Sequence, residues 1–136
     1  MGWLARHEQT LLGILRIVTG LLFLEHGTQK LFHFPPLPAE MAGAAIPHNV
    51  MVILTVAAVI ELVGGTLVIL GLFTRIVAFI CAGEMAVAYW LGHAARAHSL
   101  FPAVNGGDAA VLFCFIFLFF AAAGPGGLAL SRSTRI

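Results

Sequence analysis

Ionisable residues inside long apolar stretches are the strongest indication of function in this sequence. A charged side chain at the centre of a bilayer costs about 2.5–3.5 kcal/mol on insertion scales, so such residues usually face a partner or a cavity. Four of them lie within residues 11–32 alone. We take seven residues as a candidate intramembrane polar site: Arg16, Glu25, His26, Lys30, Glu61, Glu84 and His93.

On a helix, the first apolar stretch places its cations beside small residues. At 100° per residue, Arg16, Gly20, Phe23, Gly27 and Lys30 share one stripe. The glycines predict the close approach of another helix, to which the same face presents the two cations. Because the side chain of Glu25 points away from Arg16, Arg16 is expected to find its carboxylate on a neighbouring helix, at Glu61 or Glu84.

His26 and Lys30 have the chemistry to bind a quinone. A neutral imidazole and an ammonium group near one membrane face can hydrogen-bond the headgroup carbonyls, and histidine can relay protons. In the alternative interpretation Lys30 reaches out to lipid headgroups and His26 bonds a helix carbonyl. Glu25 is either a proton acceptor facing a cavity or a polar residue at headgroup level, and the sequence leaves both open.

Haem and metal sites are not expected. A bis-histidine haem needs His26 and His93 to face one cavity, and loop histidines such as His33, His48 and His98 are usually solvated. The two cysteines, Cys81 and Cys114, lie singly in apolar runs and form no CxxC motif. They are interpreted as small packing residues.

Composition places the chain in the membrane. Of 136 residues, 60% are hydrophobic and only 10% are charged, against about a quarter in soluble domains. The net charge of +1 gives no indication of nucleic acid binding. We predict one all-α polytopic membrane domain over residues 1–136, a four-transmembrane-helix bundle in contact with the lipid bilayer.

Four segments reach spanning length: residues 10–32, 49–72, 75–93 and 107–123. Residues 33–48 hold four of the six prolines and form an irregular loop or a short re-entrant element. Residues 71–75 predict a tight turn that makes the second and third helices an antiparallel hairpin. The Gly-Pro-Gly-Gly run at 124–127 ends the fourth helix.

The distribution of cations predicts the orientation. Arg6, Arg75, Arg132 and Arg135 lie on one side of the predicted spans, whereas Arg96 and Lys30 lie on the other. Since cytoplasmic loops carry the excess of Lys and Arg, both termini are predicted to be cytoplasmic.

An ordered set of motifs resembles the DoxX family. It comprises Arg16, Gly20, EHGTQKLF (25–32), Glu61 with Gly64-Gly65, LVILGLFTR (67–75), NGGD (105–108) and GPG (124–126). The resemblance implies a small four-helix protein of the bacterial cytoplasmic membrane. Some members of this family are subunits of thiosulfate:quinone oxidoreductases, and others are linked to membrane redox complexes that handle thiol or oxidative stress.

Three functions remain open at this point. No loop is long enough for a soluble catalytic domain, and no self-contained catalytic motif is present. The first hypothesis is a subunit or anchor of a quinone- or thiol-linked redox system, in a homo-oligomer or with a redox protein partner. It would contact quinone through Arg16, His26, Lys30 and Glu61. The alternatives are a small oligomeric proton-coupled carrier that uses Glu25, Glu61 and Glu84 as a relay, and a structural membrane scaffold.

Overall fold

The computed structural model describes residues 2–37 and 46–131, and every regular element among them is helical. Arg132, Arg135 and the middle of the proline-rich loop, on which the predicted orientation and the re-entrant element partly depend, lie outside these residues. The elements in chain order are α1 (Gly2–Ala5), α2 (Glu8–Phe32), α3 (His48–Leu70), α4 (Thr74–Val87), the π-helix η1 (Ala88–Ala94), α5 (Ala95–Ala97), α6 (Pro102–Asn105) and α7 (Asp108–Ala123).

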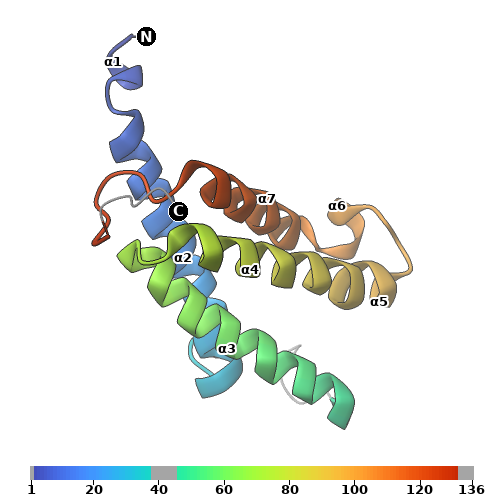
Figure 1. Cartoon of the computed structure of the whole chain (residues 1–136). Helices are drawn as coiled ribbons and strands as arrows, with labels where there is room; N and C mark the ends of the chain where they lie inside the picture. The colour runs from blue at the N-terminus through green and yellow to red at the C-terminus, as the bar shows by residue number, and fades with distance from the viewer. Residues whose placement is uncertain (1, 38–45, 132–136) are drawn as a thin grey trace.

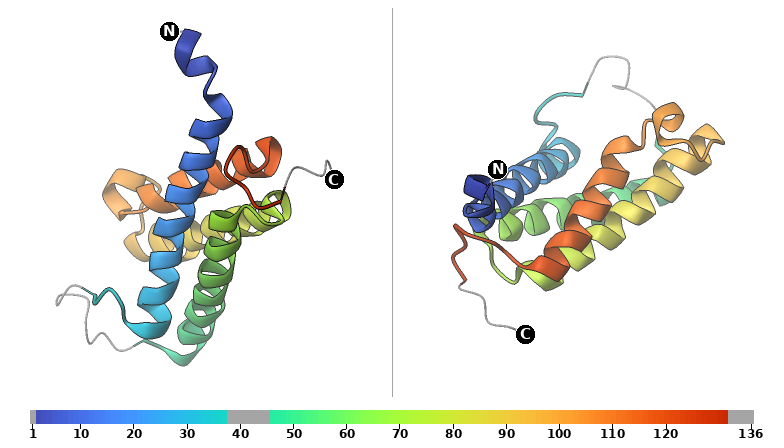
Figure 2. Two further views of the ribbon diagram at one scale, coloured as in Figure 1. Left: turned by 90° about the vertical axis from the view of Figure 1, so that its left-hand side faces the viewer. Right: turned by 90° about the horizontal axis from the view of Figure 1, so that it is seen from above.

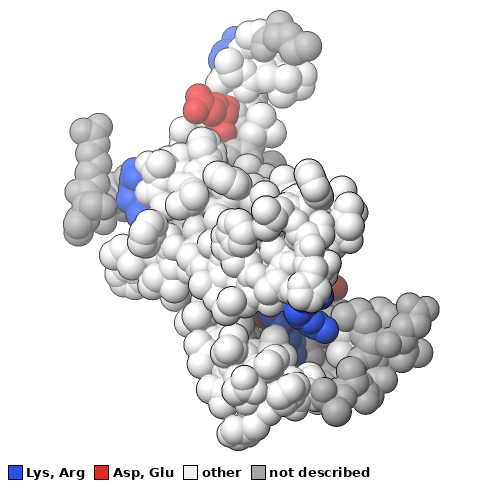
Figure 3. All heavy atoms as spheres, turned by 90° about the vertical axis from the view of Figure 1, so that its right-hand side faces the viewer, with Lys and Arg blue, Asp and Glu red and all other residues white. Residues whose placement is uncertain are grey.

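Three helices are long and apolar enough to cross a membrane. They are α2, α3 and the continuous rod of α4, η1 and α5, while α7 is a shorter apolar helix. Large apolar side chains such as Leu21, Val52 and Phe79 are at least half exposed, and one broad face of the molecule is almost free of charged groups (Figure 3). Soluble proteins rarely expose a contiguous apolar surface of this size. The predicted all-α, multi-pass membrane class is confirmed.

The four apolar helices form two antiparallel pairs that cross each other. α2 packs mainly along α3, and α4 packs mainly along α7. The α4–α7 pair lies across the α2–α3 pair (Figures 1 and 2). The predicted turn after α3 is present, with Gly71 and Phe73 both in the left-handed region. However, α3 and α4 diverge from this turn and do not pack as a hairpin, because each has a more extensive partner elsewhere.

Glycines bring α2 and α3 into backbone contact, as the stripe on α2 predicted. A Cβ atom added to Gly27 would lie 2.7 Å from the Leu62 nitrogen, and one added to Gly65 would lie 2.9 Å from the Leu24 nitrogen. At Gly20, an added Cβ would lie 2.8 Å from the side chain of Ile69. Helix pairs in membranes gain stability from such close packing, since lipid removes the hydrophobic drive between them.

Aromatic side chains fill the crossing point of the two pairs. Phe23 is fully buried, with its ring 4.7 Å from that of Phe117 and 5.8 Å from that of Phe113 (centroid distances). Phe117 and Phe120 are also fully buried, whereas Phe115 and Phe119 on the other side of α7 are exposed. The phenylalanines of α7 therefore divide between the core and the lipid-facing surface, as expected for packing residues.

The close contact generates a prediction about stability. Gly27→Ala should destabilise the protein by about 1–3 kcal/mol, the usual cost of overpacking, because its new methyl group meets the α3 backbone. The matched control is Gly83→Ala, whose added methyl group meets nothing within 4 Å. This control should leave stability unchanged or raise it by up to about 1 kcal/mol, the helix propensity gain of alanine. Thermal unfolding of both variants in detergent checks this, and equal effects would contradict the close contact.

Candidate functional site

Arg16 is fully buried and donates only to backbone carbonyls. Its Nε bonds the Pro125 oxygen at 2.8 Å, and its Nη1 bonds the oxygens of Val68 and Ile69. Its Nη2 bonds the oxygens of Gly127 and Leu128, at 3.3 and 2.9 Å. The five N–H groups of the guanidinium are thereby all used. The expectation that Arg16 pairs with Glu61 or Glu84 is wrong.

The physical reason lies in the end of α3. The last four carbonyls of a helix have no partner within it, and a partner must be found within the protein where no water is at hand. Arg16 donates to the carbonyl oxygens of Val68 and Ile69. The carbonyl oxygens of Leu67 and Leu70 accept from the backbone nitrogens of Leu72 and Leu130, respectively. A cation at a helix C-terminus is also favoured by the helix dipole. A carboxylate is therefore not required to hold Arg16 in place.

Arg75 plays a similar part at the end of α7. Its Nη1 donates to the oxygens of Ala121 and Ala122, just before the helix ends at Ala123. Both arginines thus stabilise helix C-termini at the same end of the molecule, where residues 124–131 cross α2 and α3 (Figure 1). We assign structural roles to both.

Lys30 forms the ion pair that the sequence assigned to Arg16. Its Nζ lies 2.5 Å from Oε1 of Glu61. The Glu61 side chain is 2% exposed and that of Lys30 is 32% exposed, so the pair opens to the surface on the lysine side. Gly27 makes this possible, because the absence of a side chain lets α2 rest against α3 beside Glu61. Lys30 therefore turns toward the protein and does not extend to the lipid headgroups.

Two carboxylate oxygens at this site are buried and have no partner in the described part of the chain. They are Oε2 of Glu61 and Oε2 of Glu84. Glu84 lies on α4, about one helical turn from Cys81, whose Sγ would lie 2.7 Å from a Cβ atom added to Gly64, itself about one turn from Glu61 on α3. The site therefore joins α2, α3 and α4. Unpaired buried polar atoms are rare in native proteins and require an explanation.

His26 borders this cluster, whereas Glu25 is exposed. The imidazole of His26 is close enough to interact electrostatically with Glu61, and its ring packs edge-on against Phe113 at 6.1 Å. Glu25 is an exposed residue, and we find no ion pair to its carboxylate within the described segments. We define the acid–base cluster as His26, Lys30, Glu61 and Glu84.

His93 lies apart from the acid–base cluster. It belongs to the π-helix η1, where its Nδ1 is 3.3 Å from the oxygen of Asn105. Tyr89 of the same turn donates to the Leu100 oxygen at 2.7 Å. These bonds hold the connection before α7 against η1. Across residues 2–37 and 46–131, no group of three or more His, Cys, Asp or Glu residues is placed to hold a metal ion.

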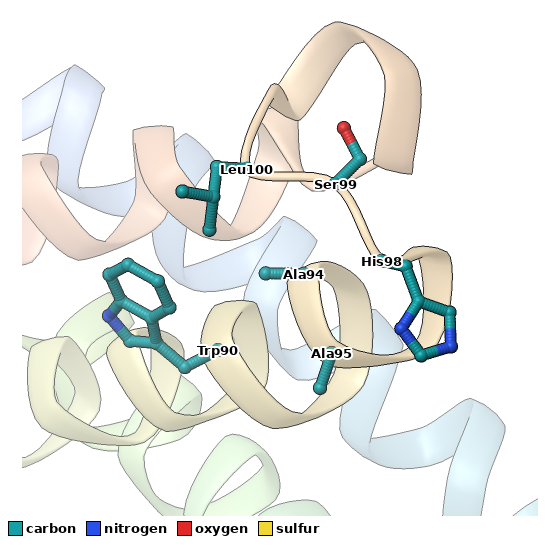
Figure 4. Close-up of a pocket in the computed structure, with 6 residues that line it drawn as sticks. All are labelled: Trp90, Ala94, Ala95, His98, Ser99 and Leu100. Carbon is teal, nitrogen blue, oxygen red and sulfur yellow. The ribbon is translucent and has the colours of Figure 1, made fainter.

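A hollow of about 360 Å³ lies beside this turn, away from the acid–base cluster. Its lining is Trp90, Ala94, Ala95, His98, Ser99 and Leu100, with Trp90 and His98 at opposite ends (Figure 4). His98 is its one titratable side chain, so the hollow offers little acid–base chemistry. The acid–base cluster is the stronger candidate.

Comparison with known proteins identifies the family. A sequence model of DoxX matches residues 11–94. The chain belongs to the DoxX family. A relative from Haemophilus influenzae (strain ATCC 51907 / DSM 11121 / KW20 / Rd), described as an uncharacterized protein, is 43% identical over 133 residues, which cover 97% of this chain and 96% of that protein. No solved structure matches significantly. The matched DoxX segment contains all seven candidate residues.

Sequence reasoning missed the role of the segment after α7 in this DoxX protein. From the sequence, residues 124–127 were assigned the structural role of a helix stop. In the structure, the carbonyl oxygens of Pro125, Gly127 and Leu128 accept hydrogen bonds from Arg16. Gly13 and Gly127 are the residues of the sequence that indicate this crossing. A Cβ on Gly13 would lie 2.2 Å from the Gly127 oxygen, so both positions must stay small for the segment to cross α2.

The carbonyl contacts predict that the two arginines differ in their tolerance of lysine. Arg16→Lys should destabilise the protein by several kcal/mol, because an ammonium has three donors for the five carbonyls and lacks the planar fork. Arg75→Lys is the matched control and should cost much less, since one nitrogen makes both of its bonds. Unfolding in detergent followed by circular dichroism compares them. A loss of stability as large in Arg75→Lys as in Arg16→Lys would rule out this explanation.

Proposed function

We propose that this DoxX protein is a membrane subunit of a quinone-linked redox system and that its acid–base cluster is the quinone headgroup site. The observation that carries the proposal is the part-buried ion pair of Lys30 and Glu61 beside two buried carboxylate oxygens that have no partner among the described residues. Reduction of a quinone to a quinol takes up two electrons and two protons. A quinone site therefore needs hydrogen-bond donors and groups that exchange protons, and the cluster offers both.

Each residue has a defined role in this proposal. Lys30 uses one of its three donors on Glu61, and the others are available to a headgroup carbonyl at the partly exposed end of the side chain. His26, exposed at the edge of the cluster, donates to the second carbonyl or passes protons to it. Glu61 and Glu84 supply protons from the buried side.

Electrons are proposed to come from a partner protein. The chain's two cysteines, Cys81 and Cys114, are both free and lie on different helices, α4 and α7. A flavin-bearing or thiol-oxidising subunit in contact with the DoxX protein fits the redox role, either in a heteromer or with a homo-oligomer of this chain.

We further propose that all four apolar helices cross a bacterial inner membrane, with both termini in the cytoplasm. Lys30 pairs with Glu61 inside the protein, so among the described cations it does not count as a loop charge. Arg6 and Arg75 then outnumber Arg96 near the ends of the spans, which supports this orientation. With 16 residues, α7 is about 24 Å long and needs some local thinning of the bilayer.

The proposed site predicts that quinone binding depends on Lys30. The wild-type protein, purified gently from its own membranes, should carry an isoprenoid quinone in native mass spectrometry. Lys30→Ala and His26→Ala should lose it and abolish the redox phenotype in a deletion strain while still inserting and folding.

Arg96→Ala, which removes an exposed cation from α5, is the control and should retain both quinone and phenotype. Full complementation by Lys30→Ala and His26→Ala would show that the headgroup site is wrong. Flux of protons in liposomes without an electron donor, together with a bare homo-oligomer in the mass spectrum, would favour a proton-coupled carrier instead.

A further inference from the structure

The charges buried at the acid–base cluster do not balance. Lys30 contributes one positive charge from α2, and Glu61 and Glu84 contribute two carboxyl groups from α3 and α4. With both carboxyl groups ionised, the cluster would carry a net negative charge in the apolar interior. A charge buried without a partner is so costly that the group is neutralised instead.

No other described cation can supply the missing charge. Arg16 is the one fully buried cation of residues 2–37 and 46–131, and its five donors are occupied by carbonyls at the other end of the molecule. His26 interacts with Glu61, but its side chain lies exposed at the edge of the cluster and bonds neither of the two free carboxylate oxygens. From α4 the buried thiol of Cys81 packs against α3 at Gly64, and from α7 the uncharged ring of Phe113 packs beside His26.

The hydrogen bonds indicate the same imbalance independently of charge. Lys30 satisfies Oε1 of Glu61, but Oε2 of Glu61 and Oε2 of Glu84 are both shut off from solvent and have no partner within the described residues. Two ionised carboxylates are acceptors only, and neither can help the other. A protonated carboxyl group loses its charge and gains an O–H donor, so a single proton removes the charge imbalance and gives the pair one donor.

We infer that Glu61 and Glu84 hold one exchangeable proton between them and that this proton resides mainly on Glu84. Glu61 keeps its charge because Lys30 is bonded to it. The two carboxyl groups then titrate as a pair. As the proton donor of the quinone site, the pair depends on the proposed function. The proton itself does not, and it can be measured without quinone or a redox partner.

Labelling by dicyclohexylcarbodiimide tests the inference on the full-length protein in detergent or liposomes. This apolar reagent reacts with a protonated carboxyl group. The acid oxygen bonds to the central carbon of the reagent, the proton moves to a nitrogen, and an acyl shift gives a stable N-acylurea with no leaving group. Peptide mass spectrometry should find the adduct on Glu84, decreasing as pH rises, and none on the exposed Glu25 or Asp108.

Charge variants give the sharper result. Glu61→Gln should reduce labelling of Glu84 several-fold, because Lys30 is then available to the single remaining carboxylate. Lys30→Gln should extend labelling to Glu61, because no buried cation is left to hold either carboxylate. The matched controls Glu25→Gln and Arg96→Gln remove exposed charges and should leave the labelling of Glu84 unchanged.

An infrared measurement covers the case in which a variant folds poorly or the reagent cannot enter. The wild-type spectrum should contain a carboxylic acid C=O band that is lost in Glu84→Gln, with folding checked by circular dichroism. Absence of both the band and the adduct would overturn the inference. Protection of Glu84 from labelling by Na⁺ at constant ionic strength would also overturn it, since a metal cation would then balance the charge. A positive result combined with no bound quinone would reject the proposed function and leave the shared proton standing.

Discussion

The burial of the Arg16 guanidinium among backbone carbonyls is the interaction on which the rest of the structure depends. In the apolar interior, the end of α3 leaves carbonyl groups that water cannot reach, and a buried arginine leaves five donors in the same condition. The guanidinium donors and the carbonyl acceptors satisfy one another. Arg16 bonds the oxygens of Val68 and Ile69 on one side and those of Pro125 and Leu128 on the other. This single side chain joins α2, α3 and the C-terminal segment.

Because carbonyl groups bind Arg16, no carboxylate is needed to neutralise it. A carboxylate that neutralised it would have been tied to the same end of the molecule. Instead Glu61 is available to Lys30, about four helical turns further along α2. The DoxX protein therefore has two polar regions with different chemistry. In one, backbone carbonyls satisfy all the donors of Arg16 and the helix ends are fixed. The other contains acids whose buried oxygens have no partner in the described part of the chain, and it opens toward the surface through Lys30.

Glycine contacts connect these two regions. Gly20 and Gly27 stand between Arg16 and Lys30 on one stripe of α2, and both let α3 approach so closely that a side chain would collide with it. A rigid α2–α3 pair keeps the spacing between the carbonyl-bound arginine and the ion pair constant. The α4–α7 pair lies across it, with Phe23 and Phe117 between them, and contributes Glu84 to the acid–base cluster.

Much of the fold of this DoxX protein could be predicted from its sequence, because the length of apolar stretches, helical periodicity and glycine spacing are local properties of the chain. They predicted an all-helical membrane protein, the stripe on α2 and the close approach of a second helix. They also selected Arg16, Lys30, Glu61 and Glu84, since ionisable residues in apolar stretches are recognisable without a structure.

Only the tertiary structure decided the pairing. Charge suggested that Arg16 binds a carboxylate, but the ends of α3 and of the 124–128 segment converge on Arg16, and Glu61 lies opposite Lys30. The crossing of the two helix pairs was likewise not visible, because it depends on which faces pack best in three dimensions and not on any one segment.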